Sequence, residues 1–500
     1  MGAQNLPDKR RGQRIVIHKN KFLISFWLCL SVLSQLTVSG GAAGAAVNDE
    51  EQAGIQASRE VEEQIGIYKG EFLANYVDAV GRRLAASLDN RPYRFRFKIV
   101  DQAEPNAYAL PGGHIYVSRG ILAQINSEDE LAAILAHEIS HVTLMQHAQH
   151  PSRSGLPGLL ALPGQAVGAI VGDDIGNIIN APIEAAGQVY LFSYNRSQES
   201  DADQAGMRLA AKAGYDPAAL GNALDTLGKT LLLTGGQETF SFYKSHPTTP
   251  SRVADIYALA TQIEWTATRP FAADRARFLD RLNGLWWGPQ NPSNGVFQGW
   301  KFMHADMRFT MTFPDGWRLV NAPGYVGAFE PNQKALIVLG GAARSMDPSV
   351  PAQALVTRFK DEASVFPVES RAVDIGPWPG YLVRFEDTSG VEPVSLYYMW
   401  VTSPGTTFIV IGLGADEYRD QLGDAAFSLR GLSIEERDSI YSDRIRIAEA
   451  EENESLTELS FRSDNLWDDE ITAVMNGLSA DAELDKGDLI KVVRRGRYWR

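Results

Sequence analysis

Cysteine is nearly absent from the chain: Cys29 is the only one in 500 residues. Because a disulfide within one chain needs two cysteines, no such bond can hold this fold together. Positive charge is scarce relative to negative charge, with 47 Lys and Arg against 61 Asp and Glu and a formal net charge of −14. This balance argues against a nucleic-acid partner, because phosphate backbones are bound by basic surfaces.

Long apolar runs without charge are also rare, and the clearest one covers residues 22–38. Small residues follow it at 40–46, and it is preceded by Lys9, Arg10, Arg11, Arg14, Lys19 and Lys21. This order predicts a cleaved secretory signal peptide at residues 1–46. Cleavage would remove those six basic residues and one acid, which leaves a net charge of −19 and no expected membrane span. The alternative is an uncleaved N-terminal anchor.

Residues 137–141 read His-Glu-x-x-His. On a helix, His137 and His141 project from one face and can bind a single metal ion. Glu138 lies beside that face, where it can take a proton from water. The alternative is a solvated helix that carries two histidines by chance. The surrounding alanine and leucine favour the metal, because burial of these polar side chains without a partner would be costly.

The local sequence places this motif on a helix. Ser127 and Glu130 have the spacing of a capping box, which predicts a helix from residue 128 with Glu130 reaching back to its N-cap. Leu131, Ile134 and Leu135 give that helix an apolar surface.

A zinc peptidase needs a third protein ligand, and Glu199 is the best candidate. Glu199 and Asp203 are four residues apart at the start of a second expected helix, so both can face the first. One carboxylate could bind zinc while the other orients a ligand imidazole by a hydrogen bond. The alternative is that both acids only stabilise the N-terminal end of that helix.

Four passages together give the chain a recognisable pattern. They are Glu-Pro-Asn-Ala-Tyr-Ala-Leu-Pro-Gly-Gly-His-Ile-Tyr-Val-Ser-Arg-Gly at 104–120, the His-Glu-x-x-His helix, Glu199-x-x-x-Asp203, and Ser245-His246-Pro247 with Arg252. Residues 55–265 thus resemble the zinc metallopeptidases related to the CAAX prenyl endopeptidase, the mitochondrial Oma-type protease and the periplasmic beta-barrel assembly-enhancing protease. The resemblance implies one Zn²⁺ per chain, bound by His137, His141 and Glu199, with Glu138 as general base and Asp203 supporting a ligand.

The first passage also predicts a sheet edge. Alternating apolar residues indicate strands at 93–100, 107–110 and 114–118, with a Pro-Gly-Gly turn between the last two. Such an edge could bind an extended substrate by backbone pairing. The candidate substrate-binding residues are Asn106, Ala107, Tyr108 and His114. The alternative is a hairpin that only stabilises the zinc helix.

His246 is a further candidate catalytic residue, with three interpretations left open. It could stabilise the oxyanion of the reaction, or it could occupy the open metal position as a fourth ligand and hold the enzyme inactive. It could also be a structural histidine that bonds to a backbone carbonyl.

Between the two helices lies an insertion at residues 155–191, rich in glycine and proline and without charge from 154 to 172. That many helix-breaking residues argue against a membrane helix. The insertion is predicted to be a lid or plug over the cleft, with a bilayer-grazing loop or a packed helical hairpin as alternatives.

The remaining chain predicts two further parts after a linker at 286–300. Strands are expected at 309–313, 317–320, 325–329, 335–339, 381–385, 395–401 and 407–413, and helices at 350–362 and 417–429. This order predicts an α+β domain at 301–435, of unknown role, with an antiparallel sheet and helices on one face. It resembles PsbP-like sandwiches.

Residues 450–495 resemble a divergent lysin motif, a small module that binds peptidoglycan glycan. The similarity lies in Leu456-Thr457-Glu458-Leu459, Trp467, Met475-Asn476-Gly477-Leu478 and residues 484–492, and it lacks the usual opening strand. The alternative is a structural cap. The basic end, Arg494, Arg495, Arg497 and Arg500, could contact an anionic wall or membrane surface.

The predicted fold is therefore multidomain. A mainly α (α+β) zincin-like protease domain at 47–285 precedes the α+β domain and the lysin-motif-like module. The predicted function is that of a secreted, periplasmic zinc endopeptidase that cleaves misfolded or stalled envelope proteins, with peptidoglycan as a further candidate partner. The alternatives are a chaperone-like binding protein with little proteolysis and a peptidoglycan-associated scaffold.

Overall fold

The computed structural model describes residues 42–144, 194–234, 242, 245–246, 250–332, 334–342, 345–387 and 393–498. The chain divides into two units, residues 1–48 and residues 49–500. Helix α2 (Ala42–Gln64) begins in the first unit, and all later elements lie in the second. The insertion at 155–191 falls outside the described residues, and so does the predicted signal peptide up to residue 41.

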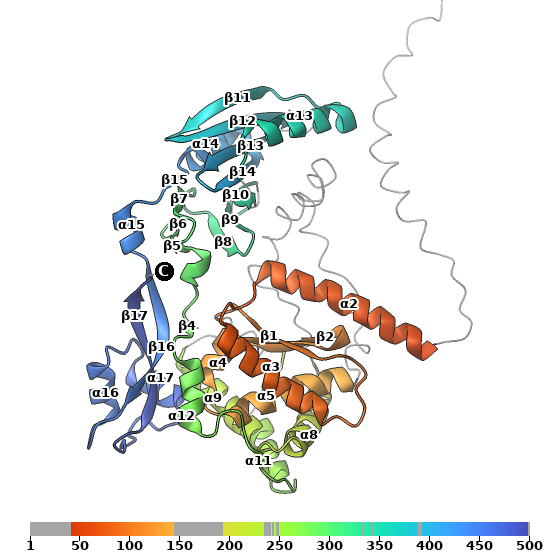
Figure 1. Ribbon diagram of the computed structural model, residues 1–500, viewed down its shortest axis with the longest axis vertical. Helices are drawn as coiled ribbons and strands as arrows, with labels where there is room; N and C mark the ends of the chain where they lie inside the picture. The colour runs from red at the N-terminus through yellow and green to blue at the C-terminus, as the bar shows by residue number, and fades with distance from the viewer. Residues whose placement is uncertain are drawn as a thin grey trace, which may run out of the picture. The chain divides into compact units, whose positions relative to one another are not determined.

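The part that carries the predicted zinc helix has a small sheet with helices around it (Figure 1). Its strands are β1 (Arg96–Val100), β2 (Ala107–Leu110) and β3 (His114–Ser118), in the order β1-β3-β2. β3 pairs in parallel with β1 and antiparallel with β2, so β2 is an edge strand. The three strands predicted from the sequence are present, although the first begins at Arg96 and not at residue 93. Edge strand β2 packs against α5, the predicted zinc helix.

Helix α5 (Glu128–Thr143) begins at the predicted residue, and the Ser127 hydroxyl accepts a hydrogen bond from the Glu130 amide. The other half of the predicted capping box is wrong, because the Glu130 carboxylate accepts from the Asn126 amide. The other helices here are α3 (Glu71–Ala86), α4 (Arg119–Gln124), α8 (Arg196–Lys212), α9 (Ala219–Leu233), α11 (Pro250–Ala260) and α12 (Arg275–Leu282). Among the described residues, no helix is both long and apolar enough to cross a bilayer.

The α+β domain contains two antiparallel sheets. The seven-stranded sheet has the order β11-β12-β13-β14-β10-β9-β8 and the four-stranded sheet the order β15-β7-β6-β5. Their strands are β5 (Val296–Gln298), β6 (Lys301–His304), β7 (Phe309–Thr312), β8 (Arg318–Ala322), β9 (Tyr325–Phe329), β10 (Ala335–Ala342), β11 (Glu369–Ile375), β12 (Trp378–Asp387), β13 (Val394–Ser403), β14 (Thr406–Ala415) and β15 (Arg430–Gly431). Three helices accompany them: α13 (Ser349–Ala363), α14 (Arg419–Phe427) and α15 (Ile434–Asp438).

The prediction that the helices cover one face of the sheet is wrong. Successive residues of β10 belong to two different cores, Leu336 and Val338 to one and Ile337 and Leu339 to the other. Helix α13 packs in the first core, whereas α14 and the four-stranded sheet pack in the second. Both faces of the central strands are apolar, and so both must be covered.

The C-terminal part has the order β16 (Tyr441–Glu449), α16 (Leu456–Arg462), α17 (Asp469–Met475) and β17 (Leu489–Arg497), and the two strands pair antiparallel. It begins before the predicted residue 450, with strand β16. Strand β4 (Trp286–Trp287) pairs with β16. Residues 286–300 therefore contribute strands to two sheets in addition to linking two domains.

A buried lysine joins this C-terminal part to the protease part. Lys491 is 0% exposed, and its ammonium donates to the carbonyls of Ala123 and Ile125 at 2.9 and 2.8 Å. These carbonyls lie just before α5. Burial lowers the pKa of Lys491 well below its usual value, and only partners inside the protein compensate for the lost hydration.

We predict that Lys491→Met lowers the free energy of unfolding by about 2–4 kcal/mol, because two buried carbonyls lose their donor. Lys486→Met is the matched control, since the Lys486 side chain is 72% exposed and should change stability by less than about 0.5 kcal/mol. Urea denaturation of the full chain, followed by circular dichroism, measures both. Equal midpoints for the two variants would contradict the assigned role of Lys491.

Candidate metal centre

Two helices approach closely enough to bring their polar side chains together. Gly206 of α8 lies against the α5 backbone, where an added Cβ would be only 2.9 Å from the backbone nitrogen of His137. A larger residue at 206 would therefore push the helices apart. The close approach places Glu199, one helical turn inside α8, opposite His137 and His141 of α5.

The described residues contain one group of side chains able to bind a metal ion, formed by His137, His141, Glu199 and His246. One ligand atom from each lies within 4.8 Å of the others, and each residue is at most 1% exposed. The sequence predicted the first three as ligands, and the structure brings them together. It also brings in His246 from a distant part of the chain.

The separations of the ligand atoms fit a small tetrahedral ion. The Nε2 atoms of His137 and His141 are 3.0 Å apart, and Nδ1 of His246 is 3.2 Å from Nε2 of His137. The Glu199 carboxylate lies 2.9 Å from Nδ1 of His246 and 3.5 Å from Nε2 of His141. Ligand atoms around a tetrahedral zinc with bonds of about 2.0–2.1 Å lie about 3.4 Å apart, so the donor set fits zinc.

Glu138 lies next to this group and is also fully buried. One of its carboxylate oxygens is 3.4 Å from Nε2 of His246. The backbone amide of Ala109, in edge strand β2, donates a hydrogen bond to the Glu138 carboxylate. Burial raises the pKa of Glu138 to about 8, although the nearby His137 opposes this shift. A carboxylate that can change its protonation near neutral pH suits transfer of a proton.

Arg252 fixes the acids of the second helix. Its guanidinium binds Asp203 through two hydrogen bonds of 2.7 Å and lies 2.6 Å from Oε2 of Glu199. Asp203 in turn lies 3.0 Å from Nδ1 of His137. Burial alone would raise the pKa of Asp203, but hydrogen bonds from His137 and Arg252 lower it to about 2. Asp203 thus stays ionised and turns Nε2 of His137 toward the other ligand atoms.

Two aromatic side chains that the sequence did not identify hold the histidines in place. The ring of Tyr194 stacks on His141 with centroids 3.7 Å apart and an interplanar angle of 8°. Phe242 stacks on His246 with centroids 4.7 Å apart. Neither aromatic belongs to one of the sequence motifs described above, so no pattern pointed to them.

The predicted substrate-binding residues lie in different surroundings. Asn106 and Ala107 are buried at the start of β2, and neither side-chain atom of the Asn106 amide has a hydrogen-bond partner among the described residues. Tyr108 packs against Tyr116 in an apolar cluster, and His114 lies beside Arg96. The side chains of Tyr108 and His114 therefore lie outside the metal-binding group, whereas the backbone amide of Ala109 in β2 reaches Glu138 beside it.

Comparison with known proteins agrees with this geometry. The family model for peptidase family M48 matches residues 72–260, which include all the residues of the metal centre. These residues form an M48 peptidase domain. The M48 domain thus contains α3 to α11, the small sheet and Arg252.

Curated relatives match less than half of this chain. The putative beta-barrel assembly-enhancing protease of Vibrio cholerae is 30% identical over 43% of this chain and 45% of its own. The beta-barrel assembly-enhancing protease of Escherichia coli K12 is 25% identical over 49% of this chain and 51% of its own. The mitochondrial metalloendopeptidase OMA1 of Schizosaccharomyces pombe is 30% identical over 36% and 51%. The chain thus spans about half the length of these relatives.

Among solved structures, cyanobacterial PsbP from Synechocystis matches 29% of this chain and 99% of its own at 13% identity, with a TM-score of 0.23. A likeness at this level supports no conclusion about the α+β domain.

We predict that Arg252→Lys weakens zinc binding by the M48 domain about 10–100-fold, because lysine cannot bind both carboxylates of the pair. Arg208→Lys, at an exposed position of the same helix as Glu199, is the control and should bind zinc normally. Competition with a chromophoric chelator measures both dissociation constants. If Arg252→Lys binds zinc as tightly as the control, the guanidinium does not position the ligands.

Proposed function

We propose that this chain is a zinc-dependent endopeptidase of the bacterial periplasm that cleaves misfolded or stalled envelope proteins. The observation that carries the proposal is the buried group of His137, His141 and Glu199 with Glu138 beside it. The names of the bacterial relatives support a role in the assembly of envelope β-barrels. The periplasmic location rests on the predicted signal peptide and on these relatives.

The charges of the site support a divalent ion. Among its described residues, Glu199 and Asp203 place two negative charges in the interior against one positive charge on Arg252, and Glu138 adds a third negative charge when it is ionised. A bound dication would balance the two excess negative charges of the ionised site, which burial otherwise makes costly. Bound zinc would polarise the scissile carbonyl and lower the pKa of water at the site to about 7.

Other residues of the chain transfer the proton and bind the substrate. The Glu138 carboxylate takes a proton from the attacking water and returns it to the leaving amine. Among the described strands, only β3 pairs with β2, and the other side of β2 faces Glu138; we propose that an extended substrate pairs along this side. The side-chain amide of Asn106, just before the same strand, has no hydrogen-bond partner among the described residues, and we propose that it binds the substrate backbone.

We predict that Glu138→Gln keeps one zinc per chain but loses most hydrolysis of an unfolded protein, because Glu138 is the base and not a ligand. Elemental analysis and a cleavage assay on the same sample test the two halves. The double variant His137→Ala/His141→Ala is the control and should contain no stoichiometric zinc. Near-normal cleavage by Glu138→Gln, or full zinc in the double variant, would contradict the proposal.

We propose further that His246 restrains the enzyme. Its Nδ1 lies as close to His137 and Glu199 as a fourth ligand would, and Phe242 holds its ring. With four protein ligands the site resembles a closed structural site, in which no position is open for water.

The variant His246→Ala distinguishes restraint from catalysis. If His246 closes the site, its removal opens one position and raises the basal rate of cleavage. If His246 stabilises the oxyanion, the rate falls about 10²–10³-fold. We expect the increase, measured on an unfolded substrate with zinc content checked in parallel. A decrease would assign the oxyanion role, and an unchanged rate would exclude both roles.

A further inference from the structure

A cavity lies outside the metal centre, where the two sheets of the α+β domain meet. It has a volume of about 440 Å³, and its lining includes β6 and β7 of one sheet and β8, β9, β10 and β14 of the other. Lys69, Ser293 and Asn294, from outside these strands, complete the polar part of the lining. None of the lining residues belongs to the metal centre. The volume is within the range of pockets that bind small molecules, so it has room for a peptide side chain.

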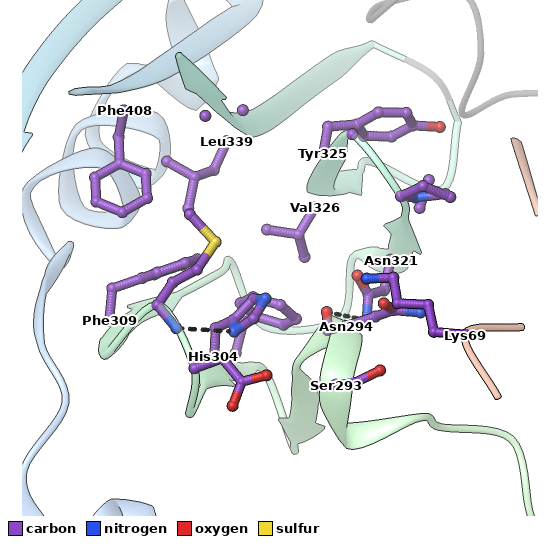
Figure 2. Close-up of a pocket in the computed structure, with 18 residues that line it drawn as sticks. Lys69, Ser293, Asn294, His304, Phe309, Asn321, Tyr325, Val326, Leu339 and Phe408 are labelled. Carbon is purple, nitrogen blue, oxygen red and sulfur yellow. Dashed lines mark hydrogen bonds between the residues drawn. The ribbon is translucent and has the colours of Figure 1, made fainter. Parts of the chain in front are cut away.

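The cavity has an apolar side and a polar side. Figure 2 shows Phe309, Phe408 and Leu339 on one side, and these side chains continue into the buried core of the domain. The polar residues on the other side are Lys69, Ser293, Asn294 and Asn321 (Figure 2). A ligand that fits must therefore combine an apolar group with polar groups next to it.

The charged side chains that line the cavity do not favour a ligand of one sign. Lys69 and Asp306 contribute one charge of each sign. Nδ1 of His304 accepts a hydrogen bond from the Met307 amide at 3.3 Å, and burial lowers the pKa of His304 to about 4. At neutral pH the imidazole is uncharged and carries its proton on Nε2, where it can donate to a carbonyl. This combination suits a peptide group better than a phosphate.

The backbone of β10 also has a free edge at the cavity. Pairing of β10 with β9 ends at Gly340↔Tyr325, whereas pairing with β14 continues to Ala342↔Thr407. No strand in the described chain pairs with Gly341 and Ala342 on the β9 side. Because Gly341 has no side chain, another backbone can approach it closely.

We propose that this cavity is a second binding site for unfolded polypeptide, in which an apolar side chain enters between the sheets and the flanking backbone pairs beside Gly341. The inference rests on the proposed function, because it gives the same substrates a contact remote from the scissile bond. A contact of this kind would select chains that expose apolar side chains, which folded proteins bury.

The test fills the cavity without disturbing the fold. A Cβ added at Gly341 would lie 3.8 Å from Cε of Met307, an ordinary contact, so Gly341→Leu places its side chain at the mouth. Gly423→Leu on α14 is the matched control, because a Cβ there has no neighbour within 4 Å. Both changes are made in full-length, zinc-loaded protein that also carries Glu138→Gln, so that binding is measured without cleavage.

The probe is reduced, carboxymethylated α-lactalbumin, which stays unfolded, and its dissociation constant is measured by fluorescence anisotropy. We expect Gly341→Leu to bind it about tenfold more weakly than Gly423→Leu, since one apolar side chain loses its site. Equal affinities would overturn the proposal. As a second measurement, a photo-crosslinking residue at Met307 should crosslink to the probe, and failure to do so would also overturn it.

Other outcomes separate this proposal from the proposed function. If the wild-type chain cleaves no unfolded protein but Gly341→Leu still weakens binding, the protease assignment fails and the second site stands. If cleavage is normal and Gly341→Leu changes nothing, only the second site fails. Native mass spectrometry that finds a lipid in the cavity, not displaced by the probe, would assign a lipid ligand and overturn the polypeptide.

Discussion

The close contact between α5 and α8 is the constraint on which the metal centre depends. Gly206 lets the two helices approach, and this approach alone brings Glu199 within reach of His137 and His141. The motif supplies two ligands on one helix, but it does not determine where the third ligand lies. The distance between the helices determines it, and the backbone of one glycine sets that distance.

The interior of the M48 domain contains several charged side chains that are buried together with their partners. Arg252 holds Glu199 and Asp203, and Asp203 holds His137. A buried charge without such partners would cost several kcal/mol or would become neutral. The same rule explains Lys491, whose ammonium replaces water with two backbone carbonyls. Polar contacts therefore hold helix α5 in two places, just before its first residue and at its metal-binding face.

Sequence patterns identified those parts of the fold that depend on neighbouring residues. The strands at 107–110 and 114–118 and the start of α5 follow from alternation and capping, and the structure contains them. Strand β11 was missed because it is an edge strand with mostly exposed, polar residues. The placement of α13 and α14 on opposite faces was missed because strands with apolar residues on both faces do not show which helix covers which.

The residues expected to bind the metal were predictable from the sequence, but the side chains that hold them in place were not. His137, Glu138, His141 and Glu199 follow from spacing and donor chemistry. Tyr194 and Phe242 could not be predicted, because stacking on an imidazole leaves no pattern in the sequence. The cavity between the sheets likewise combines residues from 69 to 408, so only the folded chain reveals it.

The central claim is that four side chains from three parts of the chain surround one zinc ion. Anomalous diffraction at the zinc edge, on crystals of zinc-replete protein, tests it most directly. The claim predicts a single strong peak bounded by His137, His141, Glu199 and His246. A peak elsewhere, or none at these four residues, would contradict it.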